Sequence, residues 1–249
     1  VGTTFVIGPA VLAWVGPQNA QAVWWAVGFL ALGLLGSLTV PAMPAAHDEG
    51  DVHVGLRGVW HALVTHPMVM AIGFIGGFFE SGLTAMLPLY GLALGLGATA
   101  AALLVSASGL GSALVMLPAG ELADRMARHP EQRWGNAAQS RRRLMRAGAG
   151  LTLAATLVIP FVASTPWLAA PVAFVWGGAG GSLYTLVMID IGSRETGNTL
   201  VNSTAVLVMS YTLGGVLAPA LGAAALQWSP TVGFPALLLI VAGAGYALL

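Results

Sequence analysis

The chain has 249 residues, of which 57% are hydrophobic and only 7% are charged. A water-soluble domain of this length could not bury so much apolar surface, and the apolar residues form long uninterrupted runs. Such runs exclude a membrane β-barrel, whose strands alternate apolar and polar residues, and favour membrane-crossing helices. The formal net charge is zero and no basic stripe with interleaved aromatic residues is present, so the sequence indicates no nucleic-acid partner.

The sequence also lacks the residue types that many enzymes and metal sites require. It has no cysteine, which excludes disulfides, thiolate metal sites and thiol nucleophiles. The five histidines lie in or beside polar segments, at loose spacings that do not form a metal set. An intramembrane enzyme would need converging nucleophile, base or metal groups, so we expect neither catalysis nor a cofactor.

The apolar runs predict an all-α, polytopic membrane protein with about eight transmembrane helices. Its mean hydropathy is +0.84. In chain order, the predicted helices cover about residues 3–15, 23–40, 68–92, 99–122, 144–162, 168–191, 200–226 and 232–249. The longest polar connections are residues 44–66 and 124–143.

The distribution of arginine predicts the orientation of the chain in the membrane. All nine cationic side chains are arginine, and they follow the second, fourth and sixth predicted helices. The connections on the opposite side carry no arginine, so the arginine-rich connections should be cytoplasmic. We interpret the exclusive use of arginine as the mark of a GC-rich bacterial genome, so the expected location is a bacterial inner membrane.

The connection at residues 44–66 contains a predicted amphipathic helix. Its apolar residues recur at helical spacing, while Arg57 and His61 lie elsewhere on the helix; the apolar set is Leu56, Val59, Trp60 and Leu63. One interpretation is a helix that lies in the membrane interface with Trp60 as its anchor. The other is an ordinary loop helix packed on the bundle, and the pattern alone does not separate the two.

Glu80 is the first candidate for a functional side chain, because it lies near the middle of a predicted membrane helix. Hydrocarbon surroundings disfavour a charged carboxylate, so a carboxyl group there is suited to carrying a proton or holding a cationic substrate. The alternative is a neutral glutamic acid that makes a hydrogen bond between helices. Because intramembrane ionisable residues are usually functional, we predict that Glu80 binds the proton or the substrate.

Other intramembrane side chains could line a cavity with Glu80. The predicted substrate-contacting residues are Trp176, Tyr184 and Asn202, and the further candidates are Ser203 and Tyr211. Each of them taken alone is explained better by helix packing or by an aromatic belt at the membrane surface. The pairs Gly73/Gly77 and Gly177/Gly181 have the spacing that lets two helices approach closely, and we expect packing there rather than ligand contact.

Two charged segments are candidates for a conformational gate. Asp190 lies near the end of a predicted helix with Arg194 four residues later, a spacing that permits an ion pair. A structural ion pair at the membrane edge is the simpler interpretation, and gating is the alternative. In residues 120–128, Gly120 would allow close helix approach, and Asp124 could cap a helix or pair with an arginine. As a pattern alone, this segment is equally an arginine-rich loop with incidental acids.

The segment 120–128 resembles the signature loop of the major facilitator superfamily. The matching residues are Gly120, Leu122, Asp124, Arg125 and Arg128, and Ala127 stands where the family usually has a glycine. Gly8-Pro9 and the run from Gly214 to Gly222 are similar to the glycine- and proline-bearing helices of the two family halves. The resemblance implies alternating access between two six-helix bundles, with Asp124 and Arg125 controlling the inside gate. We assign Gly120 and Arg128 of the same motif to this gate, and Asp190 as a further candidate.

On this resemblance, the chain corresponds to the family's fifth to twelfth helices. Residues 1–41 would hold the last two helices of the N-terminal bundle, residues 42–66 the cytoplasmic linker, and residues 67–249 the C-terminal six-helix bundle. The expected function is proton-coupled secondary transport of a small solute across a lipid bilayer. Because the sequence begins without methionine and ends within an apolar run, we expect a fragment that needs the first four helices. The alternative is a non-transporting membrane scaffold or a truncated transporter.

Overall fold

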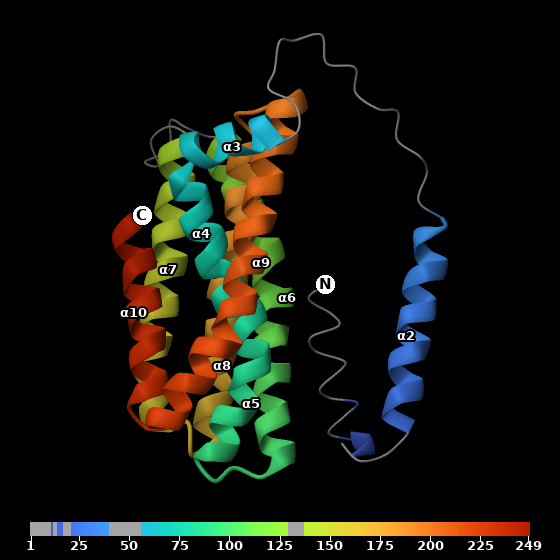
Figure 1. The fold of residues 1–249 in the computed structure, drawn as a ribbon, viewed down its shortest axis with the longest axis vertical. Helices are drawn as coiled ribbons and strands as arrows, with labels where there is room; N and C mark the ends of the chain where they lie inside the picture. Colours follow the sequence, from blue (N-terminus) through green and yellow to red (C-terminus); the bar gives the residue numbers. More distant parts are fainter. Residues whose placement is uncertain (1–10, 12–13, 17–20, 40–55, 129–136) are drawn as a thin grey trace.

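The computed structural model describes residues 11, 14–16, 21–39, 56–128 and 137–249. Within these ranges the chain is helical and contains no strand, which confirms the all-α prediction (Figure 1). The elements are α2 (Gln21–Ser37), α3 (Leu56–Thr65), α4 (Pro67–Gly77), the π-helix η1 (Phe78–Gly82), α5 (Leu83–Ala93), α6 (Ala98–Arg128), α7 (Ala137–Val162), α8 (Pro166–Gly192), α9 (Gly197–Trp228) and α10 (Gly233–Leu248).

Four of these helices, α6 to α9, are long and apolar enough to cross a bilayer. The elements α4, η1 and α5 follow one another without a gap over residues 67–93, where the sequence predicts one span. Shorter apolar helices lie in α2 and α10. The chain is therefore a polytopic helical membrane protein, as predicted. The first predicted helix, at residues 3–15, falls mostly outside the described residues.

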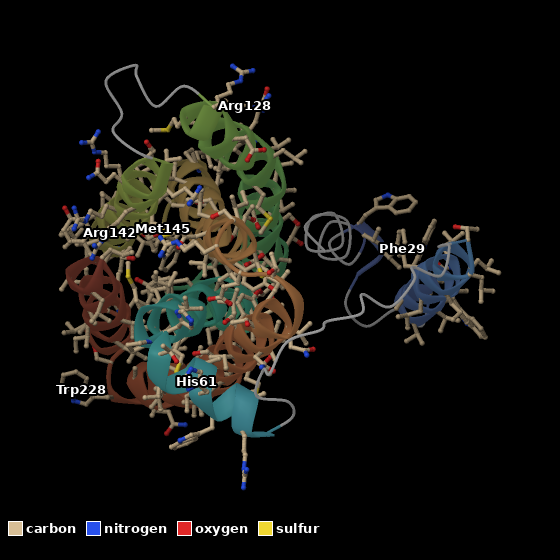
Figure 2. All side chains as sticks on the ribbon, turned by 90° about the horizontal axis from the view of Figure 1, so that it is seen from above. Phe29, His61, Arg128, Arg142, Met145 and Trp228 are labelled. Carbon is tan, nitrogen blue, oxygen red and sulfur yellow. The ribbon has the colours of Figure 1, made fainter. Side chains whose placement is uncertain are left out.

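The described arginines gather at one end of the bundle, which we call the arginine-rich end. Arg57 lies on α3, and the remainder lie at the end of α6, the start of α7 and the end of α8. Figure 2 looks down on this end and labels Arg128 and Arg142 there. The opposite end is formed by the short connections that join α5 to α6, α7 to α8 and α9 to α10 (Figure 1).

The polar connection between α6 and α7 is shorter than the sequence predicts. We expected α6 to end near Leu122, but it continues to Arg128, and α7 begins at Ala137 rather than near Leu144. The added residues are mostly good helix formers, and Arg125 and Arg128 favour the negative end of the helix dipole. The family-like motif is therefore on the last turns of a helix.

Helix α3 is confirmed, but its buried face differs from the predicted one. It meets the following helix at 91° and packs against α9 and α4. Gly58 and Ala62 are buried against the bundle, whereas Trp60 is 66% exposed and Val64 is 64% exposed. Small residues pack closely at a helix crossing, so the large apolar side chains are left on the outer side. The helix thus packs on the bundle and also presents an apolar surface outwards.

Two helix pairs cross so closely that only glycine fits between them. An added Cβ at Gly177 of α8 would overlap the carbonyl oxygen of Ser108 on α6, and one at Gly111 of α6 would overlap the carbonyl oxygen of Phe174 on α8. The same reciprocal arrangement joins α4 and α9. There, a Cβ at Gly77 would overlap Tyr211 and one at Gly214 would overlap Phe74. The packing interpretation of the glycine pairs is confirmed.

Candidate functional site

The backbone around Glu80 departs from a regular α-helix. Residues 78–82 form a single π-helical stretch between α4 and α5. A π-turn holds one residue more than an α-turn, and such single turns inside α-helices are frequent at functional sites. Glu80 is half-buried, while its neighbours Phe78 and Phe79 are buried in the core. The carboxyl group therefore lies on the less covered side of the helix, near the middle of the 67–93 span.

Polar side chains from two other helices bond to this carboxyl group. The hydroxyl of Ser112 on α6 donates to Oε1 of Glu80 at 3.2 Å. Tyr211 on α9 makes a second side-chain hydrogen bond with Glu80. The rings of Tyr211 and Tyr184 meet edge to face with centroids 5.1 Å apart, which brings α8 into the same group. We call Glu80, Ser112, Tyr184 and Tyr211 the Glu80 cluster.

The structure places the other two predicted substrate residues away from this cluster. Trp176 is 1% exposed and packs on Phe79, with ring centroids 5.9 Å apart. Within the described part of the chain, its buried Nε1 has no hydrogen-bond partner. Asn202 is half-buried on α9, about 13 Å along the helix from Tyr211, towards the arginine-rich end. Their roles in substrate binding stay predictions.

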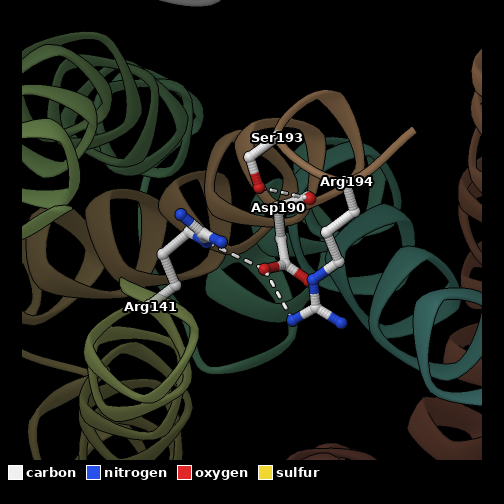
Figure 3. A network of polar contacts seen from close by, with 4 residues as sticks. All are labelled: Arg141, Asp190, Ser193 and Arg194. Carbon is white, nitrogen blue, oxygen red and sulfur yellow. Dashed lines mark hydrogen bonds and ion pairs between the residues drawn. The ribbon is translucent and has the colours of Figure 1, made fainter. Parts of the chain in front are cut away.

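At the arginine-rich end, Asp190 is shared by two arginines. Its Oδ1 accepts from Nε of Arg141 on α7 at 2.8 Å and from Nη2 of Arg194 at 2.9 Å (Figure 3). The pair with Arg194 has the predicted spacing of four residues. Arg141, which the sequence analysis did not connect with Asp190, joins α7 to α8. Its side chain is only 7% exposed, against 57% for Arg194.

The motif residues on α6 are arranged differently from this buried network. Arg125 pairs with Glu121 on the preceding turn, and both side chains are exposed. Nε of Arg128 donates to the backbone carbonyl of Asp124 at 3.4 Å, and among the described residues no ion pair or hydrogen bond involves the Asp124 carboxylate. A Cβ at Gly120 would meet Ile189 at 3.7 Å, an ordinary contact. In this conformation, close approach at Gly120 does not require glycine.

Replacing Asp190 by asparagine is expected to destabilise the protein by about 3 kcal/mol, because it leaves the buried guanidinium of Arg141 without its counter-ion. Arg194→Gln is the matched control. It removes the exposed partner of the same carboxylate and should cost less than about 1 kcal/mol. Thermal unfolding in detergent, followed by tryptophan fluorescence, measures both. If both variants lowered the unfolding midpoint equally, the ion pair between Asp190 and Arg141 would not be the main source of the stabilisation.

The described residues include no group of three or more histidine, aspartate or glutamate side chains that could hold a metal ion. The Glu80 cluster offers one carboxyl group, one alcohol and two phenols. Such a set can exchange a proton and form hydrogen bonds, and its rings can contact a cation or an apolar group.

Comparison with known proteins identifies the family. The family model described as Major Facilitator Superfamily matches residues 1–205, which is most of the chain. No curated protein matches the sequence significantly. The matched range includes the π-helix, the α6 motif and Asp190, together with the long apolar helices α6 to α8. The chain therefore belongs to the Major Facilitator Superfamily, a family of membrane transporters.

Proposed function

We propose that this protein is a secondary active transporter that moves a small solute across the membrane by alternating access, coupled to protons. The observation that carries the proposal is the Glu80 cluster. One half-buried carboxyl group lies within a membrane span, bonded to Ser112 and Tyr211 from two other helices. An ionisable carboxyl group within a membrane span is energetically costly, and such groups usually have a function. Binding a proton or a substrate is a function that this carboxyl group can perform.

In this proposal, Glu80 couples the proton to the solute. The protonated carboxyl group donates one hydrogen bond and is neutral, whereas the carboxylate only accepts hydrogen bonds and carries charge. The two forms therefore have different affinities for a solute held against Tyr184 and Tyr211. Coupled transport requires that proton and solute also bind the two conformations of the protein with different affinities. Trp176 and Asn202 are further substrate-binding candidates in other parts of the bundle.

The arginine-rich end is proposed as the cytoplasmic gate, in a bacterial inner membrane. The gate comprises Gly120, Asp124, Arg125 and Arg128 of the α6 motif and the Asp190 network. We assign residues 1–41 to the end of the family's N-terminal bundle, residues 42–66 to the linker and residues 67–249 to the C-terminal bundle. The transport cavity then lies between the bundles.

Alternating access can be tested by chemical labelling, because the sequence has no cysteine that would interfere. Met116 lies one turn from Ser112 on α6 and is half-buried beside the Glu80 cluster. The thiol of the Met116→Cys variant should react with a membrane-impermeant maleimide added from either side of the membrane. Inside-out and right-side-out vesicles expose the two sides in turn. A thiol in Leu157→Cys, on the exposed side of α7, should stay unreactive in lipid. Labelling of Met116→Cys from one side only would contradict alternating access.

A further inference from the structure

A polar cavity lies at the arginine-rich end, and none of the residues of the Glu80 cluster lines it. Its volume is about 330 Å³, within the range of small-ligand sites. The walls come from three places in the chain: the junction of α3 and α4, the start of α7 and the end of α8. The residues that matter for its chemistry are His66, Met68, Gln139, Arg142, Asp190 and Arg194.

The described residues that line this cavity carry more positive than negative charge. Arg142 and Arg194 both line it, and Asp190 is the single carboxylate among the described lining residues. Because Oδ1 of Asp190 already accepts from buried Arg141 as well as from Arg194, one carboxylate faces two guanidinium groups. Arg142 adds a third guanidinium group. Its Nε donates to the carbonyl oxygen of Leu249 at 3.0 Å, which uses one of the five N–H donors of its side chain.

The backbone of α4 contributes a second source of positive potential. The 91° bend after α3 places the start of α4 at the cavity, where Pro67, Met68 and Val69 form part of the wall. His66 occupies the N-cap position, and its side chain makes no capping hydrogen bond. Instead, its Nε2 lies 3.0 Å from Oε1 of Glu195. The first-turn N–H groups of a helix lack intrahelical acceptors and attract anions.

We propose that this cavity binds a phosphate group. Phosphate matches the donors present, because guanidinium groups bind its oxygens in a forked geometry and helix N-termini favour its charge. The group could belong to the headgroup of an anionic lipid, since the arginine-rich end of a membrane bundle lies at headgroup depth, or to a water-soluble phosphate. Both sources present the same chemistry to the cavity. The proposal does not depend on the transport function of the Glu80 cluster.

Binding can be measured with the full chain in nanodiscs, using tryptophan fluorescence to follow thermal unfolding. In phosphatidylcholine discs, inorganic phosphate is titrated at constant ionic strength against chloride. In a parallel series, phosphatidylglycerol replaces part of the phosphatidylcholine. Stabilisation by inorganic phosphate indicates a soluble source, and stabilisation by phosphatidylglycerol alone indicates a lipid headgroup. Either response supports the site only if it depends on Arg142.

Arg142→Gln should weaken the response about tenfold in probe concentration, because it removes a charge-assisted donor from the cavity wall. Arg146→Gln is a close control, since Arg146 also donates to the carbonyl oxygen of Leu249, at 2.7 Å, and does not line the cavity. Arg142→Lys keeps the positive charge but loses the forked guanidinium geometry, so it should give an intermediate response. The proposal is wrong if neither probe stabilises the protein, or if Arg142→Gln and Arg146→Gln weaken the response equally.

Discussion

Replacing Glu80 by glutamine is expected to bring proton-driven transport to background, while the protein still folds and inserts. Glutamine has the shape of the protonated side chain and can keep hydrogen bonds to Ser112 and Tyr211, but it has no proton to release. Downhill exchange of the solute should persist, because the binding surface remains. The flux that a pH gradient drives should fall at least ~10-fold, since each bond to the charged form is worth ~1.5–3 kcal/mol.

The measurement uses inside-out vesicles in which acridine orange reports an acid interior. Solutes from a panel of small metabolites and organic cations are added one at a time, and a solute that is exchanged for interior protons collapses the pH gradient. Glu195→Gln removes a carboxylate of the same kind that lies outside both the Glu80 cluster and the proposed gate, where it pairs with His66, and this variant should behave as the unmodified protein does. If a solute collapses the gradient equally well with Glu80→Gln, Glu80 does not carry the coupled proton.

Replacing Gly177 by leucine is expected to disrupt the bundle, at a cost of more than about 3 kcal/mol. A Cβ at this position would overlap the carbonyl oxygen of Ser108, and a backbone atom cannot move aside as the end of a side chain can. Gly177→Ala should already destabilise the protein by about 1–3 kcal/mol, because α6 and α8 must separate to admit the methyl group. Unfolding midpoints in detergent and the yield of monodisperse protein measure both effects.

Gly243→Ala provides the matched control for this prediction. Gly243 lies within α10, and a Cβ there would have no atom within 4 Å. The substitution should be neutral or stabilise the helix by up to about 1 kcal/mol, because alanine has the higher helix propensity. If Gly177→Ala were as well tolerated as Gly243→Ala, the α6–α8 crossing would not depend on glycine.

The positions of the long helices could be predicted because a bilayer demands uninterrupted apolar runs, and such runs are visible in one sequence. The ends of α6 and α7 could not be predicted as well. The charged residues at the end of α6 and the start of α7 were assigned to a loop. Arginine and alanine, however, continue a helix readily in water. The π-helix at residues 78–82, in which Phe78, Phe79 and Gly82 are buried, left no signal in composition.

The site was predictable only one residue at a time. Glu80 was identified because a lone acid in an apolar run is conspicuous, and Tyr184 and Tyr211 because they are polar and intramembrane. Ser112 was missed, since a serine in a helix of small residues is unremarkable until α6 lies beside η1. Arg141 was missed for the same reason. It meets Asp190 from 49 positions away, and contacts at that separation are set by the fold rather than by local spacing.

The reciprocal glycine crossings also restrict how the bundle can deform. Between α6 and α8, and again between α4 and α9, a backbone carbonyl group of each helix occupies the notch left by a glycine of the other. A shift by the 1.5 Å rise of a single residue would press a side chain against that carbonyl group, so sliding of one helix along the other meets a steep steric barrier. Each helix pair is therefore expected to move as a rigid body. A displacement at one membrane face is then transmitted to the other face, because the two helices do not slide along each other.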